Sequence, residues 1–385
     1  MSKIIAFFMA IIMFLIPSAN IPKQSLDTDK AKTEYAYVFV NGFGGWGEFD
    51  FQNKLLSYWG MVSGDMMKYL RARGVDAHAA SVDPYASAWD RACELYAQLT
   101  GTRVDYGAEH SERCGHDRFG KDYSGKALVS NWSAENKVNL IGHSFGGPTI
   151  LMLLRLMATG SDAEQAATSA EEISGLFTGG KGDWFYSLTS VAGALNGTTA
   201  VNAKEDIEDG KDTKAMEKLG VKVVGKLSDM SDRADFDCAL YDMLLDNALE
   251  LSDSFEVLEN VYYFSIPCSY TTQNSNGTWS PIRKGMTPFF HFISERMGKY
   301  TDVTPKGFVV DESWQENDGM VNTKSERAPL NAPQQDLNKD NIQPGIWNVF
   351  PTYKGDHLSL TGGIISANTE MREVYMDLIN MINAL

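Results

Sequence analysis

Short apolar runs recur along the chain, and glycine-rich or polar stretches separate them. Residues 35–40 form one run that breaks into the turn NGFGGWG, and similar runs occur in VDAHAASV, KVNLIG, FYSLTSVAG and NVYYFSIP. Their length and their content of β-branched and aromatic residues are typical of strands. We therefore expect at least five strands, spread over most of the chain.

Helical patterns lie between these strands. Residues 54–73, KLLSYWGMVSGDMMKYLRAR, end at Gly74, and Pro148 opens the helix PTILMLLRLMATG, where its missing N–H would be unpaired anyway. The last segment, residues 368–385, has one apolar helical face, formed by Met371, Val374, Tyr375, Leu378, Met381 and Ile382. Strands that alternate with helices predict an α/β fold, in which a mostly parallel central sheet carries helices on both faces.

The strand pattern continues into the C-terminal quarter, so we expect one domain over residues 33–385 with two insertions. The first insertion covers about residues 83–123. The second, at about residues 199–258, is acidic and has few strand-like runs. A chain of 385 residues can bury one core of this size.

The N-terminus has a pattern of its own. Lys3 precedes an unbroken apolar run over residues 4–16, which Pro17 and small residues follow. The run is short for a membrane span and is typical of a secretory signal. We predict a signal peptide over residues 1–19 and a secreted, extracellular protein; the alternative is an uncleaved anchor.

Composition narrows the range of partners. The net charge of −16 argues against nucleic acid and against a basic patch that anchors on anionic membranes. With 43% hydrophobic and 22% charged residues, the composition is that of a globular protein. Four dispersed cysteines, Cys93, Cys114, Cys238 and Cys268, do not form the dense framework of a small disulfide-rich domain, and their pairing stays open.

The segment GHSFG, residues 142–146, matches the G-x-S-x-G pattern. In a chain with 34 glycines the pattern alone is weak, but here an apolar strand precedes it and a helix follows. A turn this sharp strains the serine backbone and exposes its hydroxyl, while flanking glycines relieve the crowding. We predict Ser144 as a nucleophile and the N–H of Phe145 as an oxyanion donor. A glycine-rich turn with a bystander serine is the alternative.

A serine hydroxyl needs a histidine to take its proton and a carboxylate to hold that histidine. In α/β-hydrolases the chain order is serine, acid, histidine. Two histidines follow Ser144: His357 lies in a loop before the last predicted helix, and His291 lies in FFHF, where packing or binding fits better. We therefore predict His357 as the base.

For the acid, Asp318 lies on an Asn-Asp-Gly turn between apolar segments. Asp311 and Glu316 are competitors, and a solvated acidic loop is a further alternative. The second oxyanion donor should come from the turn NGFGGWG, where glycines let the backbone approach a substrate, and Phe43 is the candidate.

The stretch EHSERCGHDRF, residues 109–119, gathers two of the six histidines and one of the four cysteines. Taken alone, it fits a metal site, a catalytic site or an ordinary polar loop.

Seven motifs occur in order along the chain: NGFGGWG, YWG, AWDRACELYAQLTGTRVDYGAEHSERCGHDRFG, IGHSFGG, NGTTAVN, ENDGMVNT and DHL. In this combination the sequence resembles the thermoalkalophilic bacterial lipases of the Geobacillus type and the related staphylococcal lipases, within the α/β-hydrolase superfamily. The resemblance extends from about residue 37 to the C-terminus, and residues 88–121 are its most specific part. It implies an α/β-hydrolase fold, a triad of Ser144, Asp318 and His357, and oxyanion donors at Phe43 and Phe145.

The resemblance also implies a structural zinc ion in an inserted subdomain, at the positions Asp90, His110, His116 and Asp237. Two carboxylates and two neutral imidazoles would balance the zinc charge and leave no place for a catalytic water. Because a thiolate is a stronger zinc ligand than a carboxylate, an exchange that involves Cys114 is the alternative.

The sequence departs from this family in three places. The oxyanion turn begins with Asn41–Gly42 instead of His-Gly, which a backbone donor should tolerate. Ser359 and Ile364 lie near the places of the acids that hold calcium in the family, so we predict that the calcium site is absent. The segment over residues 202–237 is shorter and more acidic than the family's helical lid, which predicts reduced interfacial activation.

Together these observations predict a secreted serine hydrolase of carboxylic esters, specifically a triacylglycerol lipase that acts through an acyl-enzyme on Ser144. One alternative is a carboxylesterase for short or soluble acyl esters without interfacial activation. Another is a catalytically inactive, zinc-stabilised binding protein. The expected partners are acylglycerols or other lipid esters and, transiently, a lipid–water interface, but no nucleic acid; the oligomeric state stays open.

Overall fold

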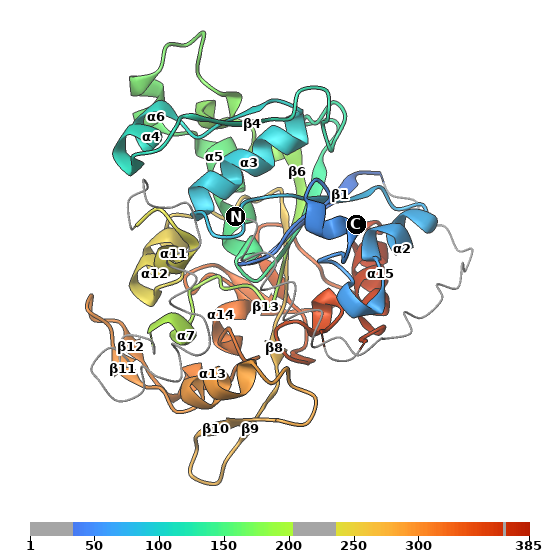
Figure 1. The fold of residues 1–385 in the computed structure, drawn as a ribbon, viewed down its shortest axis with the longest axis vertical. Helices are drawn as coiled ribbons and strands as arrows, with labels where there is room; N and C mark the ends of the chain where they lie inside the picture. Colours follow the sequence, from blue (N-terminus) through green and yellow to red (C-terminus); the bar gives the residue numbers. More distant parts are fainter. Residues whose placement is uncertain (1–33, 203–235, 365–366) are drawn as a thin grey trace.

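The structure is a computed structural model that describes residues 34–202, 236–364 and 367–385 (Figure 1). The predicted signal peptide lies outside these residues, as does most of the segment predicted to be a reduced lid. Among the described residues, no helix combines the length and the apolar character that crossing a membrane requires.

A seven-stranded sheet forms the centre of the molecule, with the order β13-β14-β7-β6-β5-β1-β2 (Figure 1). Every pair of neighbouring strands in it is parallel. The strands are β1 (Ala36–Val40), β2 (Ala77–Ala80), β5 (Val138–His143), β6 (Phe185–Val191), β7 (Tyr262–Ile266), β13 (Gln334–Asp336) and β14 (Trp347–Val349). The α/β fold with a mostly parallel sheet is thus confirmed, and all five predicted strands belong to the sheet.

Helices cover both faces of the sheet, and the side chains of β1 alternate between two hydrophobic cores. Val38 and Val40 pack into the core beneath α3 (Ala88–Thr100) and α5 (Gly146–Thr159). Tyr37 and Phe39 point the other way, into the core beneath α2 (Met66–Ala72) and α15 (Met371–Ile382). Figure 1 shows α2 and α15 together on one side of the molecule and α3 and α5 on the other.

Two predicted helices are shorter than the sequence pattern indicates. In the segment 54–73 only α2 is α-helical, because Gly60 and Gly64 adopt positive φ angles of 117° and 93° and end any regular helix before it. The helix then starts at Asp65, whose side chain accepts a hydrogen bond from the Lys68 N–H at 3.1 Å. The C-terminal helix is α15, and within its apolar face Val374 and Met381 remain partly exposed.

Smaller elements surround the sheet. Near α3 lie α4 (Ala108–Cys114), α6 (Asp162–Ala167) and the antiparallel pair β3 (Arg103–Asp105) and β4 (Phe119–Asp122). The other helices are α7 (Thr199–Asn202), α11 (Ala239–Asp242), α12 (Leu245–Asp253), α13 (Phe290–Met297) and α14 (Thr323–Arg327). The other strands are β8 (Cys268–Ser269), β9 (Thr271–Gln273), β10 (Trp279–Pro281), β11 (Asp302–Val303), β12 (Val309–Val310) and β15 (Tyr353–Lys354). The hairpin of β9 and β10 projects from the lower end of the molecule in Figure 1.

Candidate active site

Ser144 lies in the tight connection between β5 and α5, at the carboxyl end of a central strand. Its φ angle is 56°, in the left-handed region that residues with a side chain rarely adopt. The connection is so tight that a Cβ atom on Gly142 would lie 2.3 Å from the Gly146 carbonyl oxygen, so only glycine fits there. A hydrogen bond of 3.0 Å from the Ser144 N–H to the Val191 carbonyl, at the end of β6, holds the strained residue. The strand-to-helix context expected for the motif is therefore present.

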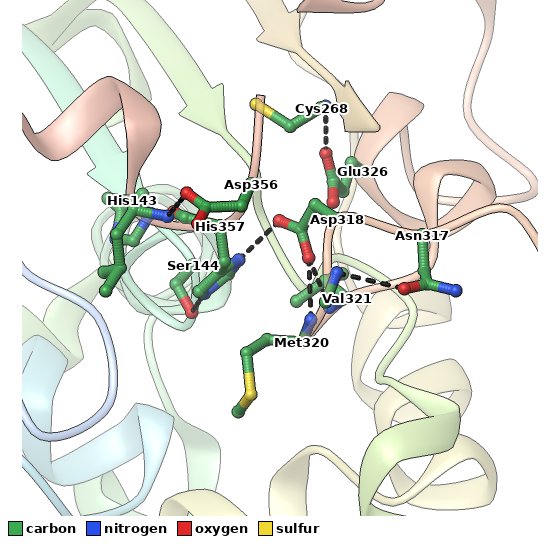
Figure 2. Close-up of polar contacts among 12 residues, drawn as sticks. His143, Ser144, Cys268, Asn317, Asp318, Met320, Val321, Glu326, Asp356 and His357 are labelled. Atoms are coloured by element: carbon green, nitrogen blue, oxygen red, sulfur yellow. Dashed lines mark hydrogen bonds and ion pairs between the residues drawn. The ribbon is translucent and has the colours of Figure 1, made fainter. Parts of the chain in front are cut away.

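Three side chains form a continuous line of hydrogen bonds at this point (Figure 2). The Oγ atom of Ser144 is 2.8 Å from Nε2 of His357, and Nδ1 of His357 is 2.5 Å from Oδ2 of Asp318. All three residues are buried. This is the order of contacts that lets an imidazole take the hydroxyl proton while a carboxylate holds the ring in one tautomer.

The backbone fixes Asp318 in place for this contact. Its second oxygen, Oδ1, accepts hydrogen bonds from the N–H groups of Met320 at 2.9 Å and Val321 at 2.8 Å (Figure 2). In addition, the backbone carbonyl oxygen of Asp318 accepts a hydrogen bond of 3.0 Å from the backbone N–H of His357. The carboxylate can therefore face the imidazole in only one way.

The competing candidates lie elsewhere. Asp311 is exposed and caps a short 3-10 helix by accepting a bond from the Ser313 N–H. The Nε2 atom of His291 is 3.1 Å from the carbonyl oxygen of Met286. Glu316 uses its backbone carbonyl to accept a bond from the Thr323 N–H. Of the acids and histidines that the sequence offered, the structure brings Asp318 and His357 to Ser144.

Phe43 and Phe145 flank the nucleophile on two different segments. Phe43 lies in the loop after β1, and Phe145 is the N-cap residue of α5. Neither backbone N–H donates a hydrogen bond to any described residue, so both can meet a substrate oxygen.

Arg91, a residue that the sequence analysis did not single out, fixes this loop. It is completely buried on α3, and its guanidinium donates hydrogen bonds to the carbonyl oxygens of Asn41 and Asp83 and, at 2.9 Å, to the hydroxyl of Thr149. Burial lowers the pKa of Arg91 to about 10, so the side chain stays charged at neutral pH. It also lies over the Phe145 ring, 5.2 Å from its centroid. One side chain thus joins the β1 loop to the nucleophile helix.

Glu326 on α14 is a second buried carboxyl group beside Asp318 (Figure 2). One of its oxygens accepts a hydrogen bond from the Cys268 N–H, and the other, Oε1, has no hydrogen bond of ordinary geometry to any described residue. Burial and the negative charge of Asp318 raise the pKa of Glu326 well above its ordinary value. Burial beside Asp318 thus favours the protonated form of Glu326, and no sequence pattern signalled this residue.

The four predicted metal ligands also come together, around Asp90 of α3. Nε2 of His110 lies 3.0 Å from Asp90 and 3.6 Å from Asp237, and Nε2 of His116 lies 3.8 Å and 3.4 Å from the same two carboxylates. Both carboxylate oxygens of Asp237 are buried without a hydrogen bond of ordinary geometry. Two imidazole nitrogens and two buried carboxylates that face one point fit a tetrahedral cation such as zinc.

The charges in this cluster match a cation. Although burial opposes a charged imidazole, the carboxylates of Asp237 and Asp90 raise the pKa of His110 to about 9. Although burial alone would raise the pKa of Asp237, the nearby imidazoles of His110 and His116 hold it below its ordinary value. A metal ion here would compete with protons for the same lone pairs.

Cys114 offers a second combination of donors. Its Sγ atom lies 3.8 Å from Nδ1 of His110, on the ring edge opposite the one that faces the carboxylates. His110, Cys114, His116 and Asp237 can each place one donor atom within 4.8 Å of the others. All four cysteines of the chain lie in described residues, and none of them forms a disulfide.

The comparisons with known proteins identify the family of the chain. The model of the family described as "Lipase-like, C-terminal domain" matches residues 33–211 and 214–384. The chain belongs to this family. Lipase 1 of Staphylococcus aureus (strain MRSA252) is 30% identical to this lipase-like chain, in an alignment of 385 positions that covers 90% of the chain and 53% of that relative. Lipase 2 of strain MSSA476 is 31% identical, in an alignment of 362 positions that covers 86% of the chain and 50% of the relative. The chain thus spans about half the length of these curated relatives.

Solved structures of similar proteins share the fold. EstA from Clostridium botulinum is 30% identical, with a TM-score of 0.78 over 95% of this chain and 90% of that one. The lipase of Staphylococcus hyicus is 26% identical, with a TM-score of 0.76 over 94% and 99% of the two chains. The predicted likeness to staphylococcal-type lipases and the α/β-hydrolase type of fold are therefore confirmed.

The raised pKa of Glu326 predicts a pH-dependent stability. Because this pKa is higher in the folded protein, its contribution to stability is complete below the pKa of an unfolded glutamate and is lost as the pH rises toward the folded value. Glu326→Gln removes this titration. As the pH rises above the pKa of an unfolded glutamate, we expect the Tm of the parent to fall relative to that of E326Q, because the parent loses up to about 1.4 kcal/mol of unfolding free energy per pH unit.

Thermal melts of both proteins at a series of pH values test this. Glu312→Gln, at an exposed position, controls for the lost formal charge. A difference in Tm that is independent of pH would contradict the assignment.

Proposed function

We propose that the protein is a serine hydrolase of carboxylic esters, with Ser144 as nucleophile, His357 as general base and acid, and Asp318 as the acid that orients it. The observation that carries the proposal is the line of hydrogen bonds from Ser144 through His357 to Asp318. The two free N–H groups of Phe43 and Phe145 beside the hydroxyl support it, and so do relatives whose names are lipase.

In the first half of the reaction, Nε2 of His357 takes the proton from the Ser144 hydroxyl as Oγ attacks the ester carbonyl carbon. The carbonyl oxygen becomes an oxyanion that accepts hydrogen bonds from the Phe43 and Phe145 N–H groups. Asp318 stabilises the imidazolium. His357 then gives its proton to the leaving alcohol, and the C–O bond breaks to leave an acyl group on Ser144. In the second half, His357 takes a proton from water, which attacks the acyl carbon and releases the carboxylic acid.

The substrate class that we propose is the acylglycerols, so that the enzyme is a triacylglycerol lipase that contacts a lipid–water interface transiently. Names of relatives support it, such as the lipase of Staphylococcus hyicus. The alternative is a carboxylesterase for short or soluble esters, which the short acidic segment between residues 202 and 237 favours. The apolar run at residues 4–16 supports export through a signal peptide.

We also propose a structural zinc ion held by Asp90, His110, His116 and Asp237, with Cys114 as a possible replacement ligand. Bound zinc would cross-link the segments that carry these ligands and would take no part in catalysis, because four protein ligands fill its coordination shell. Residues 83–123 would then form a zinc subdomain, and residues 199–258 a reduced cap that contributes the fourth ligand.

Removing the nucleophile tests the mechanism. Ser144→Ala should lower kcat for a soluble p-nitrophenyl ester by about 10⁶-fold, because no covalent intermediate can form. Circular dichroism and Tm should remain close to the parent's. Ser124→Ala, at an exposed turn, is the matched control and should hydrolyse the ester at the parental rate. Parental turnover by S144A would refute the assignment of the nucleophile.

A chain-length series separates the lipase from the carboxylesterase. A lipase should hydrolyse emulsified long-chain triacylglycerol, and its rate should depend on the area of the interface. We expect the protein to release fatty acid from the emulsion, which titration at constant pH measures, and also to cleave short p-nitrophenyl esters. Activity on the soluble esters alone would favour the carboxylesterase.

Metal analysis tests the zinc site. The purified protein should contain about one zinc per chain, and a chelator should lower its Tm. The stabilisation that is lost would be about 4 kcal/mol if the free metal is about 1,000 times its dissociation constant. Asp237→Asn should lose the metal. Asp242→Asn should keep it, because Asp242 is a nearby buried acid that accepts a hydrogen bond from the Ala88 N–H. A zinc content near zero in the parent would defeat the proposal.

A further inference from the structure

Beneath the nucleophile lies a buried phenol–imidazole pair, Tyr58 and His143, that the mechanism above does not use. The Tyr58 hydroxyl oxygen is 2.6 Å from Nδ1 of His143 and 3.1 Å from the backbone nitrogen of Gly42. Nε2 of His143 is 2.8 Å from the backbone carbonyl oxygen of His357. Four groups from distant parts of the chain thus form one line of hydrogen bonds.

The chemistry of the two end groups determines which atom carries each proton in this line of hydrogen bonds. The Gly42 N–H can only donate, so the Tyr58 oxygen accepts there and its own proton is free for Nδ1 of His143. The His357 carbonyl can only accept, so Nε2 of His143 carries the ring proton. A neutral imidazole with a bare Nδ1 and a protonated Nε2 satisfies both contacts.

The surroundings keep the pair in this state. Burial and the neighbouring His357 ring lower the pKa of His143 well below its ordinary value. Burial raises the pKa of the Tyr58 hydroxyl, so the phenol keeps its proton. Among the described residues, the titratable groups that act on the pair are His357, Arg91 and Tyr375. Near neutral pH both members of the pair are therefore uncharged.

The two ends of the line belong to two segments of the proposed active site, the loop with Phe43 and the loop with His357. Gly42 directly precedes Phe43, and a Cβ atom on Gly42 would lie 2.6 Å from the Cβ of Ser144, so the loop lies directly against the nucleophile. Arg91 holds the preceding carbonyl, of Asn41, from the other side. The peptide group between Asn41 and Gly42 is therefore held by two hydrogen bonds. Arg91 binds its carbonyl oxygen, and Tyr58 binds its N–H.

We propose that Tyr58 and His143 are positioning residues, which hold the oxyanion loop and the backbone of His357 at a fixed place relative to Ser144. This inference rests on the proposed ester hydrolysis and deepens it. Tyr58 acts through Gly42. His143 acts through the His357 carbonyl and packs beside the His357 ring, at 4.8 Å between ring centroids. A displacement of about 1 Å in such groups can cost about 10²-fold in rate.

A purely structural role is the competing explanation, because Tyr58 also packs against aromatic rings. Its ring centroid is 5.6 Å from that of Trp46 and 5.5 Å from that of Trp59. Tyr58→Phe keeps these contacts and removes only the hydroxyl. Tyr375→Phe is a matched control, since Tyr375 is a buried tyrosine of the same core that donates a hydrogen bond of 3.0 Å to the Leu360 carbonyl.

Steady-state kinetics on a soluble p-nitrophenyl ester separate the two explanations. In Y58F we expect kcat to fall about 10–100-fold, with KM within about twofold of the parent, because the lost support acts on the transition-state oxyanion. In Y375F we expect a lower Tm and the parental kcat. His143→Gln should reduce kcat similarly, and the double variant Y58F/H143Q should lose no more than the worse single variant. Parental kcat in folded Y58F would overturn the inference.

A measurement on the parent keeps the test decisive even if a variant does not fold. In nitrogen-15 spectra of histidine-labelled protein, one imidazole should stay neutral and protonated at Nε2 from about pH 5 to pH 9. An assignment of His143 to the Nδ1-protonated form, or its titration in this range, would overturn the inference. Loss of ester hydrolysis in the parent itself would overturn the proposed function and this inference together, whereas an active parent with unaffected Y58F and H143Q would overturn only the inference.

Discussion

The backbone strain at Ser144 is the constraint on which the site depends, since a left-handed residue between β5 and α5 is what lifts the hydroxyl out of the sheet. Such a conformation costs on the order of 1–3 kcal/mol and persists only where the surroundings determine it. Here β1 and β6 clamp β5 on both sides, and the end of β6 accepts the Ser144 N–H. The central sheet therefore stabilises the strained residue, and the helices on its two faces stabilise the sheet.

Several carboxyl groups are buried near the proposed active site and the proposed metal site, and their pKa values differ. Asp318 has two backbone donors and an imidazole, whereas Glu326 beside it has a raised pKa. Burial raises the pKa of Glu94 to about 8 and that of Asp242 to about 7, close to the proposed metal site. The raised pKa values of these neighbours reflect the cost of a second buried charge beside an ionised acid.

Much of the fold could be predicted from the sequence, because five strands and the segments that contain α2, α5 and α15 have strong apolar patterns. The covering helix α3 was not predicted, since its residues were assigned to an insertion. The strands β13 and β14 escaped prediction because they have only three residues each, QQD and WNV, and their pairing comes from the sheet. Ser144, His357 and Asp318 were predictable from motif and chain order. Arg91, Tyr58 and Glu326 were not, because their contacts are to backbone groups and carboxyls that only the folded chain brings near.

The triad is assembled from remote parts of the chain: Ser144 and His357 are 213 positions apart. His357 lies in the loop between β15 and α15, and α15 packs in the core against the face of the sheet that carries Tyr37 and Phe39. Turnover by the proposed mechanism therefore requires that the sheet and this C-terminal segment are both in place. If the C-terminal segment detached while the rest of the sheet stayed folded, the circular dichroism spectrum would change little. The chain would nevertheless lack His357 at Ser144 and would not hydrolyse esters by this mechanism.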